Sequence, residues 1–359
     1  QRKLAAPALK RKQIEAYADW MVELTQAELD GWEDGADLEL HHRMMALTLK
    51  IVVKTLFNLE IEDRVEEIGA AIDATMHVFH MNTHTPWRFV PEQIPTHLTR
   101  MHDEAVGKLD AVVYDLIKQR RASQQEGDDL LYRLLIANDE EGDSMTDGQL
   151  RDEVLTMFLA GHETTALAVT YAWYLLSNSP EVAQKLFEEV DVVLGGRSAT
   201  AADIGALPYL KAVVQETLRM YSPAWIIGRQ PTEDVQIGEY LIPKGVQVLM
   251  PQAVMHYDER YFEAPQEFRP QRWLDGLEKE LPRFAYFPFG GGPRVCIGNH
   301  FAMMEAMLLI ATMAQRFDLE NRMTGPLRTQ PSVTLRPVVP VDVRAHARPQ
   351  SAKVSSHSM

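Results

Sequence analysis

The chain has 359 residues, of which 46% are hydrophobic and 24% charged, a composition typical of a globular protein with a substantial core. Its net charge of -15 argues against a nucleic-acid-binding protein, which needs a basic surface to meet phosphates. No stretch approaches the roughly 18 consecutive apolar residues of a membrane span. The single cysteine excludes an intrachain disulfide and suits a reducing compartment, so we expect a cytoplasmic location.

Helical spacing of apolar residues dominates the first half of the chain. Between Lys10 and about residue 190, apolar side chains recur three or four positions apart, as at Ile14, Tyr17 and Met21. No repeat of fixed period and no inter-domain linker is visible. The first half is therefore predicted to be mostly α-helical.

Strand signals appear only in the second half. Apolar and polar residues alternate around turn residues from Asp234 to Met250, which predicts a hairpin, and residues 333–343 give a further strand signal. The polar end of the chain, residues 346–359, is predicted to be a disordered tail. These patterns predict one domain over residues 1–345, mainly α with a small β region.

The only cysteine, Cys296, follows three glycines and a proline and directly precedes an apolar helical pattern. The free amides and the positive end of a helix stabilise a thiolate, so this position favours metal ligation. Glycines let the backbone approach a flat cofactor closely, and Arg294 is placed to contact a carboxylate. The alternative for a lone cysteine is an inert, buried side chain.

A long apolar helical segment contains an acid–alcohol pair, Glu163 and Thr164. A carboxylate beside a hydroxyl can relay protons through ordered water. A threonine in an apolar helix can instead simply bond its own i-4 carbonyl. Ala160 and Gly161 remove side-chain bulk, which lets the helix distort beside a ligand or pack closely on a neighbour.

The cysteine segment resembles the haem-binding loop of the cytochrome P450 family. The five positions of that loop motif all match: Phe289, Gly292, Arg294, Cys296 and Gly298. The resemblance implies heme b (iron protoporphyrin IX), with Cys296 as the axial ligand of the iron, in the family's mainly α fold. It also assigns Glu163 and Thr164 to proton delivery.

The resemblance extends to a charge cluster behind the haem loop. Glu216 and Arg219 lie at i and i+3, on one side of a helix, and Arg272 occupies the family position of their partner. An isolated pair with this spacing is usually solvated. With the haem loop present, the three residues are expected to form a buried scaffold.

The resemblance assigns Arg229 to a haem propionate. It also assigns a group of residues to the wall of the substrate pocket; the alternative for each of them is an ordinary core position. The pocket group comprises Met157, Phe158, Ala160, Thr165, Ala168, Trp225, Ile226, Ile227, Ser332 and Val333. Arg2 matches a basic residue that binds a propionate in the family, but the tryptophan that precedes it would fall before Gln1. We therefore expect the N-terminal part of the family fold to be missing.

Histidine is a common metal ligand, but none is expected to hold a metal here. His162 lies at a variable, non-ligating position of the family motif. His41 and His42 are adjacent on a helix and point to different faces, which makes a shared site improbable.

The expected activity is insertion of one oxygen atom from dioxygen into an apolar small molecule, with a long-chain fatty acid as the candidate substrate class. Electrons would come from a separate ferredoxin, flavodoxin or reductase, and Lys279, Arg283 and Arg316 are candidate contacts for an acidic donor. Two alternatives stay open: a peroxide-driven haem-thiolate peroxygenase, which needs no proton relay, and a non-catalytic haem-binding protein.

Overall fold

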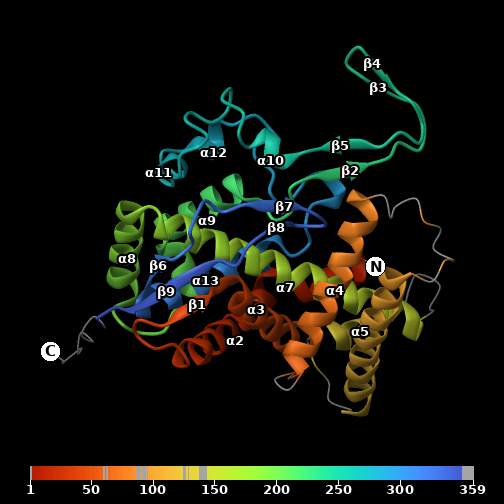
Figure 1. The fold of residues 1–359 in the computed structure, drawn as a ribbon, viewed down its shortest axis with the longest axis horizontal. Helices are drawn as coiled ribbons and strands as arrows, with labels where there is room; N and C mark the ends of the chain where they lie inside the picture. The colour runs from red at the N-terminus through yellow and green to blue at the C-terminus, as the bar shows by residue number, and fades with distance from the viewer. Residues whose placement is uncertain are drawn as a thin grey trace.

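The computed structural model describes residues 2–59, 61, 64–85, 90, 94, 96–123, 127, 129–136 and 144–349. Most of these residues are helical (Figure 1). The α-helices are α1 Arg2–Ala5, α2 Arg11–Asp30, α3 Leu40–Phe57, α4 Val65–His84, α5 His97–Ala122, α6 Leu130–Ile136, α7 Asp147–Ser177, α8 Pro180–Leu194, α9 Pro208–Met220, α10 Gln252–Met255, α11 Gln271–Leu274, α12 Leu277–Glu280 and α13 Asn299–Arg316. Short 3₁₀ turns are η1 Ala6–Leu9, η4 Ala201–Ala206 and η5 Gly292–Arg294.

Helix α7 runs through the middle of the molecule, where it packs against α3, α9 and α13 (Figure 1). It begins at a capping box, in which the Thr146 side chain accepts from the Gln149 amide and the Gln149 side chain accepts from the Thr146 amide. Its buried residues surround the helix over much of its length, as expected for a helix inside the core. This helix forms one wall of the site described below.

The strands form small antiparallel sheets. They are β1 Asp37–Glu39, β2 Ile227–Arg229, β3 Val235–Ile237, β4 Tyr240–Ile242, β5 Val248–Met250, β6 Phe317–Asn321, β7 Thr329–Pro331, β8 Leu335–Pro337 and β9 Asp342–Ala347. Strand β9 lies between β1 and β6, while β2 pairs with β5, β3 with β4 and β7 with β8. The β3–β4 hairpin projects from the body of the molecule (Figure 1).

The predicted fold class, mainly α with a small β region, is confirmed, and the hairpin signal at residues 234–250 corresponds to β3, β4 and β5. The boundary of the predicted tail was wrong. His346 and Ala347 belong to β9, where they pair with Asp318 and Phe317, because the chain end is held against β6 by backbone hydrogen bonds. Residues 350–359 lie outside the described part of the chain. In the described part, no helix is both long and apolar enough to cross a membrane.

Candidate active site

The loop that carries Cys296 is shaped by its glycines and by the helix that follows it. Gly290 and Gly292 adopt φ values of 71° and 69°, which L-residues with a side chain rarely adopt. The Cys296 amide donates to the Phe289 carbonyl at 2.9 Å, which closes the loop. Helix α13 begins at Asn299, so the cysteine lies just before a helix start, as the sequence predicts.

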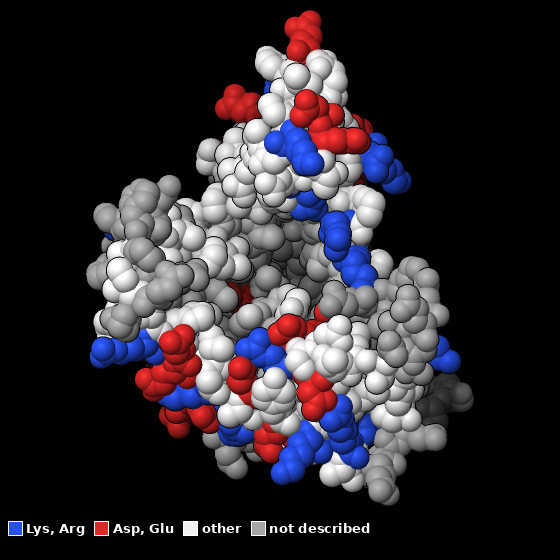
Figure 2. Space-filling view, turned by 90° about the vertical axis from the view of Figure 1, so that its right-hand side faces the viewer, with Lys and Arg blue, Asp and Glu red and all other residues white. Residues whose placement is uncertain are grey.

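A cavity of about 360 Å³ opens beside Cys296 and is here called the cysteine cavity. One wall is the cysteine loop with the start of α13, and the opposite wall is α7. The residues on these two walls and at the ends of the cavity are Leu9, Leu56, Met157, Ala160, Gly161, Thr164, Thr165, Ala168, Val214, Leu218, Pro223, Ala224, Ile227, Arg229, Gln252, Pro288, Phe289, Gly290, Arg294, Cys296, Ile297, Gly298, Phe301, Ala302, Met303 and Ala306. The molecule is visibly hollowed beneath the lobe with the β3–β4 hairpin, and Lys and Arg side chains follow one rim of the hollow (Figure 2).

The Cys296 thiol is exposed at the surface of this cavity. Crowding by neighbouring atoms still removes enough water to raise its pKa, while the Gly298 amide and the Arg2 charge act in the opposite direction. The lowered pKa expected from the helix start was therefore wrong for the protein chain alone, because desolvation outweighs the amide and the charge. A thiolate at this position needs a cation of the bound group to stabilise it.

Across the cavity, α7 presents Thr164 and the two small residues Ala160 and Gly161. The Thr164 hydroxyl donates to the Ala160 carbonyl at 2.7 Å, which is the i-4 bond named above as the alternative to a relay. A Cβ at position 161 would lie 2.9 Å from Val52 of α3. Close packing of α7 on α3 therefore gives a sufficient reason for glycine here.

Glu163 does not line the cysteine cavity. It is buried, and its Oε1 accepts from the Thr334 hydroxyl and from Arg336 Nε, both at 2.5 Å. Burial raises the pKa of Glu163, but Arg336 and Thr334 outweigh it and leave the pKa below its ordinary value. The predicted pairing of Glu163 with Thr164 at the cavity does not occur in this structure, because successive residues of a helix point about 100° apart.

The cavity wall also carries Arg229 and Arg294. Arg229 donates to its own neighbour, the Gly228 carbonyl, and neither arginine takes part in an ion pair within the described ranges. Arg2 donates to the Val295 carbonyl at 2.9 Å, directly beside Cys296. These features fit a planar, mostly apolar group that carries a metal and carboxylates. The thiol suits the metal, the apolar walls suit the plane, and the arginines suit the carboxylates.

The structure divides the predicted substrate residues into two groups. Those that line the cysteine cavity are Met157, Ala160, Thr165, Ala168 and Ile227. Five do not: Phe158 is buried against Phe57, Trp225 donates to the Ser332 carbonyl at 2.9 Å, and Ile226, Ser332 and Val333 are not among the cavity residues. Trp225, Ile226, Ser332 and Val333 lie in irregular segments next to β2, β7 and β8, where the sequence alone does not fix the direction of a side chain.

The predicted charge cluster comes together behind the cysteine loop. Glu216 accepts from both Arg219 and Arg272, with the shortest nitrogen–oxygen distances at 2.9 and 3.0 Å. Trp273 and the Arg269 amide donate to the same carboxylate, and Arg219 also reaches three backbone carbonyls. Glu216 and Arg219 are fully buried and Arg272 is partly exposed, so the cluster joins α9 to α11 largely out of contact with solvent.

Of the basic residues predicted to meet an electron donor, Arg283 lies near the cysteine loop and Arg316 far from it. Arg316 lies at the far end of α13, about 25 Å along the helix from its start, and pairs with Asp30. Arg283 covers the Phe284 ring. A groove next to the cysteine loop is lined instead by Arg11, Lys211 and His300. Sequence reasoning missed these residues, and also Val214, Leu218 and Gln252 of the cavity, because they share no local pattern with Cys296.

The match to known proteins extends over nearly the whole chain. The Cytochrome P450 family model matches residues 1–343. Cyclooctatin synthase of Streptomyces melanosporofaciens is 35% identical over 93% of this chain and 73% of its own length. Pentalenene oxygenase of Streptomyces avermitilis is 32% identical over 94% of this chain and 73% of its own. A solved structure, the cytochrome P450DA heme domain, aligns with a TM-score of 0.87 and 28% identity over 98% of this chain and 78% of that one.

The fold and the site thus define a haem-binding class of protein, and the chain belongs to the cytochrome P450 family. Members of this family bind a haem iron, and relatives of this chain include a cyclooctat-9-en-7-ol 5-monooxygenase, 34% identical over 89% of this chain. The chain is accordingly an oxidoreductase of the monooxygenase type.

Proposed function

We propose that this protein holds heme b through the Cys296 thiolate and inserts one oxygen atom from dioxygen into an apolar small molecule. The observation that carries the proposal is the position of the only thiol on the wall of the cysteine cavity, facing the small residues of α7. When bound, the haem supplies the oxygen-activating chemistry, which thiolate donation favours. Arg229, Arg294 and Arg2 would hold its propionates by charge-assisted hydrogen bonds.

Thr164 is the residue that we assign to proton delivery at the cavity. Its hydroxyl is bonded to the Ala160 carbonyl, so its oxygen lone pairs remain available to accept from an ordered water on the cavity side. Glu163, held by Arg336 and Thr334, acts as a positioning residue that fixes this turn of α7. The apolar walls exclude bulk water, which prevents protons from reaching the site at random.

The substrate that we propose is a cyclic hydrocarbon or its alcohol rather than a fatty acid. Two relatives carry cyclooctat-9-en-7-ol and pentalenene in their names, and none of the names given above refers to a fatty acid. The side chains that face the cavity from α7 are short or unbranched, as at Met157, Thr165 and Ala168, which leaves room for a broad ring system.

Electrons come, in this proposal, from a separate ferredoxin, flavodoxin or reductase. Such donors are commonly acidic, and the groove lined by Arg11, Lys211 and His300 lies on the outer side of the loop that holds Cys296. We propose this groove as the docking position in place of Arg316, which lies at the far end of α13.

Carbon monoxide binding to the reduced protein tests the ligand assignment, because thiolate-ligated haem gives a strongly red-shifted Soret band. Turnover is then compared with dioxygen plus a surrogate reductase and with hydrogen peroxide alone. Product formation only with peroxide would identify a peroxygenase. Red-shifted haem without product under either condition would support a non-catalytic haem-binding protein.

The role of Thr164 is tested by the Thr164→Ala and Thr164→Ser variants. The alanine variant should keep the red-shifted band and consume reductant at a similar rate, but the ratio of hydrogen peroxide to product should rise about tenfold or more. The serine variant keeps the hydroxyl and should restore most of the coupling. Equal coupling in all three proteins would remove Thr164 from the mechanism.

A further inference from the structure

The segment that leads into the cysteine loop is held by the short helix α10. Gln252, the first residue of this helix, and His256, its C-cap, are four positions apart and therefore lie on the same side of the turn. Both residues are fully buried. Their side chains meet the main chain of Phe287, two residues before Phe289, where the loop motif begins.

The main chain of Phe287 is bound on both sides. Its amide donates to His256 Nε2 at 3.0 Å, and its carbonyl accepts from Gln252 Nε2 at 3.1 Å. The same carbonyl also accepts from the Gly290 amide at 2.8 Å, which closes the turn at the start of the loop. The side chains of α10 therefore fix the point from which the chain turns toward Cys296.

The imidazole of His256 is in the form that can accept at Nε2. Burial lowers its pKa to about 4, and the Arg219 charge acts in the same direction, so the ring is neutral near pH 7. An amide can only donate, so Nε2 carries the lone pair and Nδ1 the hydrogen. The backbone of Leu218 and Arg219 favours a proton on the ring, although Nδ1 makes no well-formed hydrogen bond within the described ranges.

The orientation of the His256 ring is fixed by its neighbours. The rings of Tyr286 and Phe287 pack on it with centroids 5.1 and 5.6 Å away, and Phe262 lies at 6.4 Å. The main chain of His256 is held as well, because its carbonyl accepts from Arg219 of the buried charge cluster at 3.0 Å. One histidine thus connects that cluster to the segment before the cysteine loop, with its acceptor already in place.

We propose that His256 and Gln252 are positioning residues, which hold the main chain of Phe287 and thereby keep the Cys296 sulfur at the iron. The loop between Phe287 and the cysteine contains glycines with positive φ values, and such a permissive segment needs support from outside. A sulfur that left the iron would take up a proton from water, because burial raises the pKa of the free thiol. This inference rests on the ligation proposed above for Cys296.

The test separates the acceptor from the bulk of the side chain. The terminal oxygen in His256→Gln is as many bonds from Cβ as Nε2 is, so this variant keeps the acceptor, whereas His256→Asn is one atom shorter and loses it. Gln252→Met removes the donor on the other side of Phe287 and keeps a long side chain.

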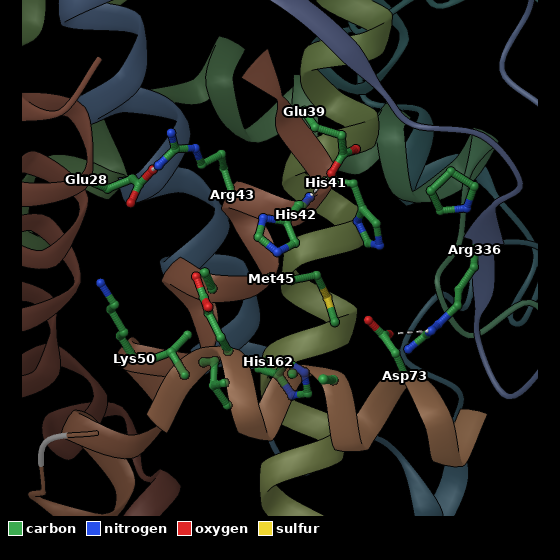
Figure 3. A pocket seen from close by; sticks show the side chains of 17 residues that line it. Glu28, Glu39, His41, His42, Arg43, Met45, Lys50, Asp73, His162 and Arg336 are labelled. Atoms are coloured by element: carbon green, nitrogen blue, oxygen red, sulfur yellow. Dashed lines mark hydrogen bonds and ion pairs between the residues drawn. The ribbon is translucent and has the colours of Figure 1, made fainter. Parts of the chain in front are cut away.

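His162→Asn is the matched control. His162 is also a buried histidine, but it lines a separate cavity between α3, α4, α7 and β8, and it is not among the residues of the cysteine cavity (Figure 3). The control therefore measures what the loss of any buried histidine does to the protein.

Two measurements are made on the haem-loaded full chain. The first is the ratio of the unshifted to the red-shifted Soret band after reduction and carbon monoxide treatment. The second is hydrogen exchange, by mass spectrometry, of peptides that span residues 285–297. We expect His256→Asn and Gln252→Met to raise the ratio and the exchange rate by about three- to tenfold, which corresponds to one lost hydrogen bond. His256→Gln and His162→Asn should stay close to the parent.

An unchanged ratio in both His256→Asn and Gln252→Met would overturn the inference, as would unchanged exchange over residues 285–297. An equal rise in His256→Gln or in His162→Asn would also overturn it, because the effect would then follow from any change to a buried histidine. A parent protein without the red-shifted band would instead refute the ligation by Cys296 on which the inference rests.

Discussion

At the scale of single residues, Cys296 combines two features that a lone cysteine rarely has together. It borders an apolar cavity, and it lies directly before the first turn of α13. Desolvation raises the pKa of its thiol, so a bound metal cation would favour the thiolate form.

Replacement of Cys296 by serine is expected to abolish the red-shifted carbon monoxide band, because no other thiol is present in the chain. The measurement is the absorption spectrum of the reduced, carbon monoxide-treated variant beside that of the parent. A variant that kept the band would show that Cys296 is not the axial ligand.

Glu305 of α13 is a second residue with an unusual environment. It is fully buried, its carboxyl oxygens lack a well-formed hydrogen bond within the described ranges, and burial raises its pKa to about 8, although Thr165 acts in the opposite direction. Between pH 4.5 and about 8 the unfolded chain ionises this carboxyl while the folded chain keeps it protonated. The unfolded state then binds fewer protons, so the free energy of unfolding falls as the pH rises through this window.

Glu305→Gln should remove this loss, because the amide is neutral at every pH. The difference in free energy of unfolding between the variant and the parent should shift in favour of the variant by on the order of a few kcal/mol from pH 5 to pH 8. Urea denaturation at both pH values measures the gain, with Glu181→Gln on the exposed face of α8 as the control. A difference from the parent that stays constant between the two pH values would refute the assignment.

At the scale of elements, the buried cluster of Glu216, Arg219 and Arg272 connects α9 to α11 and to the segment between them. Every oxygen of the Glu216 carboxylate accepts at least two hydrogen bonds, so removal of its charge affects several partners at once. The segment after α11 leads into the cysteine loop, so this cluster supports the site from behind.

Glu216→Gln is expected to lower the free energy of unfolding by about 3–5 kcal/mol, since it leaves two arginines without their counter-charge in the core. Chemical denaturation measures the loss. Glu15→Gln, which breaks the surface pair with Arg11, should cost less than about 1 kcal/mol. Similar losses for the two variants would mean that the buried Glu216 cluster contributes no more to stability than a surface ion pair.

At the scale of the whole molecule, the cysteine cavity lies between segments that are far apart in the chain, from Leu9 to Ala306. A ligand that fills it contacts η1, α3, α7, α9, β2 and α13, and therefore stabilises the folded state as a unit. Haem should raise the unfolding temperature by several degrees or more, measured by calorimetry on the protein with and without haem. Under the same conditions Cys296→Ser should show a smaller rise, whereas an equal rise would indicate that thiolate ligation adds no stability.

The sequence by itself determined the fold class and the cysteine loop, which depend on helical periodicity and on the glycines beside Cys296. The buried charge cluster of Glu216, Arg219 and Arg272 was predicted from the resemblance to the family, because the i, i+3 spacing of Glu216 and Arg219 alone is typical of a solvated pair. Only the tertiary structure decided that Glu163 turns away from Thr164 toward Arg336, some 170 residues later in the chain. It also brought His41, His162 and Arg336 to one cavity. Such contacts depend on how distant elements pack together. A local sequence pattern therefore does not show which distant side chain becomes the hydrogen-bond partner of a residue such as Glu163.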